Sequence, residues 1–422
     1  MSTFETGADM IFKYVLLIIF CKLLAEIILE LLNRTHIKKC AQSIPQKIAD
    51  LIDKDVFNKS IPYILEKNKF SITETIFDTA VLAVLLISFI FPAVFGYSYS
   101  FFTNSPIAAQ IMALLLSAFI MQIPGIPFSY YMQFHIEQRY GFNKSSIGLW
   151  ISDFVKGAVL SVVLVSVLGG AVLKLVHIFP DNWWLLAFAF TVLFQILLLI
   201  LYPRVIMPLF NKFTPLAEGP VKERLLSLAR QCNFPASGIF VMDGSKRSGH
   251  SNAFFTGFGK FRRIVLFDTL IEQLSTEELA AVLAHEIGHY KMGHVVRRLI
   301  QSVVFMGISF RVIFYLSLEE WFVQSFGFSF SRSMPAASFF CFSILASGLM
   351  FFFTPIQGFF SRRHEYAADQ YARKAMGDPE PLVQALRKLN EKNLSNPCPH
   401  PLYSGFYYSH PVLTERTSAL RT

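Results

Sequence analysis

The sequence predicts an all-α, multi-spanning membrane protein, and its composition and apolar runs are the reasons. Hydrophobic residues make up 53% of the 422 residues and charged residues only 16%, whereas soluble proteins carry roughly 25% charged residues. Phenylalanine alone accounts for 45 positions. Seven runs come close to the ~20 apolar residues that cross a lipid bilayer. They are residues 10–32, 72–95, 106–129, 148–176, 183–209, 299–319 and 336–358.

The connections between these runs predict the orientation. A net charge of +9 would also suit nucleic-acid binding, but the excess Lys and Arg lies between apolar runs, as in cytoplasmic loops. We therefore expect no nucleic-acid partner. The basic connection 33–71 is assigned to the cytoplasm, and alternation of the spans then places both large polar stretches on that side.

The chain is accordingly expected to have four parts. Residues 1–209 hold spans one to five, and 210–298 form a cytoplasmic insert. Residues 299–358 hold spans six and seven, and 359–422 form a C-terminal segment.

The first apolar run is expected to remain as a membrane helix. Its start carries Glu5 and Asp9, whereas a cleavable signal peptide starts with a basic region. The run itself contains an unusual number of charges, namely Lys13, Lys22, Glu26 and Glu30.

The cysteines indicate neither a disulfide framework nor a thiolate zinc site. There are five, an odd number, and no two form a CxxC pair. They are Cys21, Cys40, Cys232, Cys341 and Cys398.

The insert is predicted to be a small α+β unit. Residues 221–231 have the spacing of an amphipathic helix, and 238–242 and 263–267 are short β-branched and aromatic runs that predict strands. Between them, Asn252–Phe255 should be extended. Ser275 and Glu278 are spaced as a capping box that begins a helix.

That helix contains the pattern HExxH. His285 and His289 are four residues apart, so they project from one helix face and can hold one metal ion, for which we expect one Zn²⁺. Zinc would activate a water molecule whose proton Glu286 takes as general base. Two solvated histidines on a surface helix are the alternative, which the preceding capping box and apolar LAAVLA run disfavour.

A catalytic zinc site needs a third protein ligand, and the segment SRRHEYAAD supplies candidates. Glu365 is the preferred ligand, because Asp369 lies four residues on and would hydrogen-bond the outer nitrogen of a ligand histidine, plausibly His285. His364 competes but points about 100° away from Glu365 on a helix. His294 should lie on the opposite face of a straight helix, as a polar helix end.

With these motifs identified, the chain resembles the CAAX prenyl protease 1 type of membrane zinc metalloprotease. The segments HEIGHYKMGH, SRRHEYAAD, SGHSNAFFTGF and YYSHPVLTER carry the resemblance, and IEQRYGFNKSS at 136–146 extends it toward the N-terminus. The resemblance implies a hollow barrel of seven helices around a water-filled chamber, with a zincin-like catalytic domain closing one end. Charges in the first span would be solvated from that chamber.

The resemblance also implies further site residues. His410 and Arg416 would lie near the scissile carbonyl, with His410 stabilising the oxyanion. Asn252 and Ala253 would lie on an edge strand that pairs with the substrate backbone. Without the resemblance, His410 is a loop histidine before a proline.

The expected substrate is a peptide or protein, possibly prenylated. A compact insert and an ending without a basic ER-retrieval signal favour a bacterial inner membrane, and a eukaryotic member would lie in the endoplasmic reticulum membrane. Two other functions stay open: a general quality-control protease for membrane proteins, and a non-catalytic scaffold that carries zinc. The intact Glu286 speaks against the scaffold.

Overall fold

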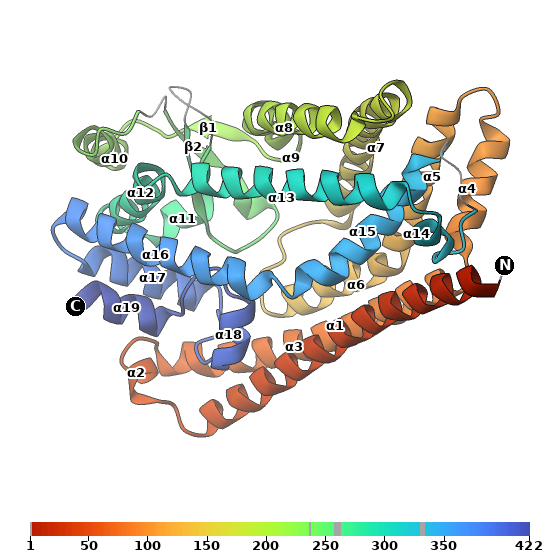
Figure 1. The fold of residues 1–422 in the computed structure, drawn as a ribbon. Helices are drawn as coiled ribbons and strands as arrows, with labels where there is room; N and C mark the ends of the chain where they lie inside the picture. The colour runs from red at the N-terminus through yellow and green to blue at the C-terminus, as the bar shows by residue number, and fades with distance from the viewer. Residues whose placement is uncertain (1, 236–237, 257–262, 330–333) are drawn as a thin grey trace.

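Figure 1 shows the computed structural model, which describes residues 2–235, 238–256, 263–329 and 334–422. Long helices run side by side along the molecule. A small sheet and several shorter helices gather at the end opposite the N-terminus, where the C-terminus also lies. The polar part therefore lies at one end of a mostly helical membrane part.

Five helical segments are long and apolar enough to span a membrane: Lys54–Ile87 (α3), Pro106–Glu137 (α5, α6 and a π-helical turn), Ile147–Ile178 (α7), Trp183–Phe210 (α8 and α9) and His294–Ser317 (α13). The helices α15 (Pro335–Phe351) and α16 (Thr354–Met376) make a sixth if this pair, bent by 58°, is one span. Within the described ranges there are thus five or six candidates, and the predicted seven is not confirmed.

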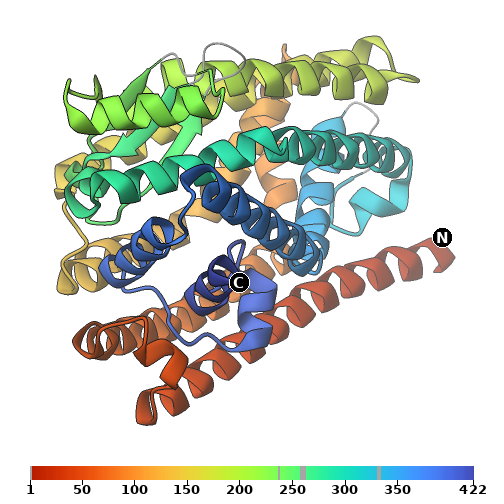
Figure 2. The same ribbon diagram turned by 90° about the vertical axis from the view of Figure 1, so that its left-hand side faces the viewer.

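The difference concerns α1 (Ser2–Gln42), which holds the first predicted run. Its charges interrupt the apolar residues. Lys22 lies 3.8 Å from Glu26, and Glu30 accepts a hydrogen bond from Ser71 of α3 at 3.3 Å. Figures 1 and 2 show α1 and α3 side by side, so Glu30 is directed toward other helices.

The outer surfaces of the long helices are apolar. Val159 of α7, Leu193 of α8 and Ile300 of α13 expose 58%, 66% and 58% of their surface. Exposed side chains of this kind suit contact with lipid tails. Two short helices, α4 (Ile90–Phe101) and α14 (Glu320–Gln324), accompany the long ones, and α2 (Gln46–Ala49) packs in a core with Cys398 and Leu413.

The polar part contains a four-stranded sheet of order β1-β2-β4-β3. β2 (Ile239–Met242) and β4 (Arg263–Phe267) are parallel, whereas β1 (Phe213–Pro215) and β3 (Ala253–Thr256) join antiparallel. The two predicted strands and the extended segment are confirmed. Residues 257–262, the end of the Gly- and Phe-rich stretch that follows, lie outside the described residues.

The polar part also contains the helices α10 (Pro220–Gln231), α11 (Asp268–Gln273), α12 (Thr276–Lys291), α17 (Glu380–Lys392), α18 (Pro401–Tyr407) and α19 (Leu413–Arg421). The predicted amphipathic helix is α10. Its buried Leu225 and Leu228 belong to one core with Leu279 and Leu283 of α12. Burying each such side chain contributes roughly 1.5–3 kcal/mol, and this core fixes α12, the helix of the HExxH pattern.

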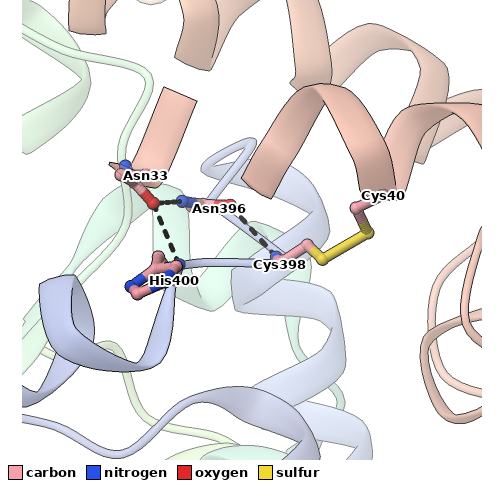
Figure 3. The surroundings of a disulfide bond; sticks show 5 residues. All are labelled: Asn33, Cys40, Asn396, Cys398 and His400. Carbon is pink, nitrogen blue, oxygen red and sulfur yellow. Dashed lines mark hydrogen bonds between the residues drawn. A yellow bond between two sulfur atoms is a disulfide. The ribbon is translucent and has the colours of Figure 1, made fainter. Parts of the chain in front are cut away.

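The structure contains a disulfide, which corrects the sequence-based expectation. Figure 3 shows Cys40, near the end of α1, bonded to Cys398, just before α18. The two cysteines are 358 residues apart in the chain, so no local spacing could reveal the pair. Beside the bond, Asn33 accepts hydrogen bonds from the Asn396 amide at 3.4 Å and the His400 backbone N–H at 3.1 Å.

Candidate active site

Helix α12 positions the HExxH residues. Its capping box is confirmed, because the Ser275 side chain accepts from the Glu278 backbone and the Glu278 side chain accepts from the Ser275 backbone. Gly288 then lets α12 approach α16 closely. A Cβ at Gly288 would lie 3.1 Å from both the Cα and the carbonyl oxygen of Ala368.

This close packing brings three predicted ligands together. The Nε2 atoms of His285 and His289 are 3.1 Å apart. Glu365 of α16 places Oε2 3.3 Å from His285 Nε2 and Oε1 3.2 Å from His289 Nε2. One ligand atom from each of the three residues lies within 4.8 Å of the others.

The three residues fit a metal ion. Two imidazole nitrogens and one carboxylate oxygen are the donors of many catalytic zinc sites, which keep a fourth position open. Glu365 is almost fully buried, and its Oε2 has no hydrogen-bond partner. An unsatisfied buried carboxylate oxygen is costly, so a cation at this point would compensate it.

Asp369 and Arg416 lie behind His285. Asp369 Oδ1 is 2.8 Å from His285 Nδ1, as the spacing on α16 suggested. Arg416 of α19 donates from Nε to Asp369 Oδ2 at 2.8 Å and from Nη2 to Oδ1 at 2.6 Å. Its Nη2 is also 3.8 Å from Glu365 Oε2. Both side chains are buried, so this chain of contacts orients the imidazole.

His294 begins a helix, as expected, but it lies beside His289 and not on the opposite helix face that the sequence predicted. Its Nδ1 lies 3.0 Å from Nδ1 of His289, and its ring stacks on His364 with centroids 4.0 Å apart. The helix does not continue straight, because Gly293 adopts a left-handed φ of 66° and α13 begins at His294. A glycine just past the last turn is a helix-end signal that would have indicated this reversal.

Glu286 and His410 face a cavity of about 970 Å³. Burial raises the pKa of Glu286, which brings this carboxyl nearer to the range of an effective base at neutral pH. His410 Nε2 lies 3.5 Å from Glu365 Oε1, while 62% of its side chain is accessible. Desolvation lowers the pKa of His410 although Glu365 opposes this.

The predicted strand residues border the same cavity. Asn252 and Ala253 line it together with His285, Glu286 and Arg416. β3 has one neighbour, β4, in the part of the sheet that is described, so its other edge is open to a further strand. Glu30 and Asn33 of α1 also line the cavity. The position of Glu30 agrees with the expectation that charges of the first span face a chamber, whereas Asn33 was not predicted, since nothing local places α1 opposite α12.

An HExxH helix, a buried glutamate from a second helix and a cavity that reaches membrane helices define a membrane-bound metallopeptidase. Residues 33–212 match the family described as CAAX prenyl protease N-terminal, five membrane helices, and residues 215–422 match peptidase family M48. The chain therefore belongs to peptidase family M48, and it is a multi-pass membrane metalloendopeptidase of a family that uses a metal, usually zinc.

Curated relatives support the assignment to this family over most of the chain. CAAX prenyl protease 1 of Saccharomyces cerevisiae is 37% identical over 416 residues, covering 92% of this chain and 90% of the relative. CAAX prenyl protease 1 homolog of Homo sapiens is 32% identical, covering 92% and 91%. The crystal structure of S. mikatae Ste24p superposes with a TM-score of 0.90 at 36% identity, covering 97% of this chain and 99% of that one.

Proposed function

We propose that this chain is a zinc-dependent endopeptidase that removes the C-terminal tripeptide of prenylated CAAX proteins. The observation that carries the proposal is the cluster of His285, His289 and Glu365 within 4.8 Å, next to Glu286 on the wall of a large cavity. The substrate class comes from the names of the relatives, which are CAAX prenyl proteases over nearly the full chain.

Each of these residues would have its own role in peptide hydrolysis. His285, His289 and Glu365 would hold one Zn²⁺, which would supply Lewis acidity for the attacking water and the scissile carbonyl. Glu286 takes the proton of that water and later delivers it to the leaving amine. The raised pKa of Glu286 supports this exchange, because a base whose pKa lies nearer the working pH also returns its proton.

His410 is proposed to donate to the oxyanion. Its Nε2 lies 3.5 Å from a Glu365 oxygen, and its ring is accessible from the cavity, where a substrate carbonyl would lie. Arg416 has its guanidinium engaged by Asp369. We therefore propose that Arg416 acts mainly through Asp369 and His285 and contributes positive charge near the scissile carbonyl.

The substrate would bind as an additional strand. The open edge of β3 begins at Ala253, and Asn252 and Ala253 lie on the cavity wall. Backbone hydrogen bonds to an edge strand tolerate varied side chains, which suits a protease that must accept different tripeptides.

We further propose the membrane arrangement. Seven helices, counting α1, would form a hollow barrel around the chamber, and the TM-score of 0.90 to S. mikatae Ste24p supports a shared membrane architecture. The division into 1–209, 210–298, 299–358 and 359–422 would hold, with the zinc site on the cytoplasmic side because the loop 33–71 is basic. The relatives are eukaryotic, so we favour the endoplasmic reticulum membrane over a bacterial one.

One experiment tests the function. The protein is purified in detergent, its zinc is measured by mass spectrometry, and cleavage of a farnesylated CAAX peptide is compared with an unprenylated one. Glu286→Gln should retain zinc and lose activity by about 10²–10⁴-fold. Equal turnover by this variant would exclude the mechanism.

The same experiment addresses the alternatives. Preference for unprenylated membrane proteins over the farnesylated peptide would favour a quality-control protease. Zinc binding by the wild type with cleavage of none of the peptides would favour a non-catalytic scaffold.

A further inference from the structure

The loop that leads into β3 is joined to a turn of the membrane part. Ser248 pairs with Asn143 in an antiparallel bridge. Gly249 donates its backbone N–H to the Phe142 carbonyl at 2.9 Å, and Lys144 donates to the Arg247 carbonyl at 3.1 Å. This turn lies within the IEQRYGFNKSS segment, so a conspicuous sequence motif contacts the approach to the proposed substrate strand.

His250 lies at the centre of this junction, which we define as residues 142–144 of the turn and residues 247–249 of the loop. Its ring stacks on Phe142 with centroids 4.2 Å apart and planes 13° from parallel. Nδ1 lies 3.0 Å from Oδ1 of Asn393, at the end of α17. Nε2 lies 3.4 Å from Oε2 of Glu137 in the π-helical turn. An oxygen atom therefore lies near each ring nitrogen, one from the end of α17 and the other from the π-helical turn of the membrane part.

Glu137 extends the junction to α3. Tyr63 donates its hydroxyl to Glu137 Oε1 at 2.8 Å, and Lys67 lies 3.2 Å from the same oxygen. Glu137 retains only 13% side-chain exposure. A partly buried carboxylate with several charge-assisted partners holds a defined position, so His250 is tied to a fixed point on the membrane helices.

The same segment is tied to β3. The His250 carbonyl accepts from the Thr269 hydroxyl at 3.2 Å, and the Ser251 N–H donates to Asn393 at 3.4 Å. Asn252 and Ala253 follow at once. Among the described residues β3 pairs only with β4. The contacts of His250 and Ser251 with Thr269 and Asn393 therefore hold the start of β3 in place at the wall of the cavity.

We infer that His250 is a positioning residue for substrate binding, which sets the register and distance of the β3 edge relative to the membrane helices. This inference rests on the proposed role of β3 as the strand that pairs with substrate. His250, Tyr63 and Lys67 all line the cavity, so a shift of this junction changes where an extended peptide lies before it reaches Glu286. The zinc ligands come from α12 and α16, outside the junction.

The test uses farnesylated CAAX peptides in which the backbone N–H of each residue around the scissile bond is replaced in turn by N–CH₃. Wild type should lose about tenfold in kcat/KM where a strand hydrogen bond is removed. His250→Ala should raise KM for the unmodified peptide about tenfold, leave kcat within about twofold, and reduce the penalty of the sensitive N-methyl group to about threefold or less. His250→Gln, which keeps one hydrogen-bonding group, should recover part of KM.

A matched pair of tyrosine variants controls for general effects on the chamber. Tyr63→Phe removes a hydroxyl from Glu137, whereas Tyr403→Phe removes a hydroxyl from Glu30 in the same cavity. The first should change KM and N-methyl sensitivity in the direction of His250→Ala, and the second should change neither. Zinc content and melting temperature are measured for every variant, and equal values exclude loss of fold as the cause.

The outcomes separate this inference from the proposed function. A wild type that cleaves no peptide contradicts the function itself. A wild type that is sensitive to N-methylation while His250→Ala keeps the same KM and the same sensitivity overturns the positioning role alone. A wild type insensitive to N-methylation at every position overturns both strand pairing and the positioning role, with peptidase activity intact.

Discussion

Arg416 holds Asp369 through two hydrogen bonds, of 2.8 Å and 2.6 Å, and thereby fixes the carboxylate that lies 2.8 Å from His285 Nδ1. Both side chains are buried, and burial would be costly for either charge alone. A partner at the outer nitrogen sets the tautomer and orientation of a metal-ligating histidine. Asp369 and Arg416 therefore act on the metal site through His285, although neither is one of the three proposed ligands.

Removing this pair should weaken zinc binding. We expect Asp369→Asn and Arg416→Met each to lower zinc affinity about 10–100-fold, measured by titration with a competing chelator. The double variant should lose less than the two single losses combined, because both act through one contact. Arg421→Gln is the control, since Arg421 lies on the same helix but pairs with Glu380 at the surface. An unchanged affinity in Asp369→Asn would refute this role.

His294 should support His289 in the same manner. Its Nδ1 is 3.0 Å from Nδ1 of His289, so His294→Ala removes the partner of a ligand without removing a ligand. Zinc affinity should fall about tenfold or more. His364→Ala is the comparison, because His364 stacks on His294 but its own buried Nδ1 has no hydrogen-bond partner. Equal zinc affinity in the two variants would show that the His289 contact is unimportant.

Gly288 should be intolerant of substitution. A Cβ there would meet Ala368 and Tyr371 at 3.1 Å, which forces α12 and α16 apart. Gly288→Ala should lower the free energy of unfolding by about 1–3 kcal/mol and weaken zinc binding, since the ligands come from both helices. Gly405→Ala is the matched variant, because a Cβ at that helical glycine meets nothing within 4 Å. Thermal unfolding and zinc titration would compare them, and equal stability would contradict the packing argument.

The Cys40–Cys398 bond should depend on the redox environment. The basic loop that follows Asn33 is proposed to lie in the cytoplasm, where thiols are kept reduced. In protein purified without reductant, alkylation after unfolding should label three of the five cysteines, and all five after reduction. Reduction should lower the melting temperature and leave zinc bound, because neither cysteine is near the ligands. Five labelled cysteines without reductant would rule out the bond.

Local sequence signals predicted the parts of this protein that depend on neighbouring residues. The capping box, the strands at 238–242 and 263–267, and the amphipathic helix at 221–231 were all predictable, because hydrogen bonding and side-chain periodicity act over a few residues. The metallopeptidase class could also be inferred, since HExxH places two imidazoles on one helix face.

Tertiary structure alone decided how these parts meet. Packing of α12 on α16 brings Glu365 to His285 and His289, and folding joins Cys40 to Cys398 across 358 residues. The count of membrane spans also depends on tertiary context, because Glu30 of α1 is directed toward other helices rather than lipid. Contacts between residues distant in sequence depend on the packing of whole helices, and no short-range pattern encodes that packing.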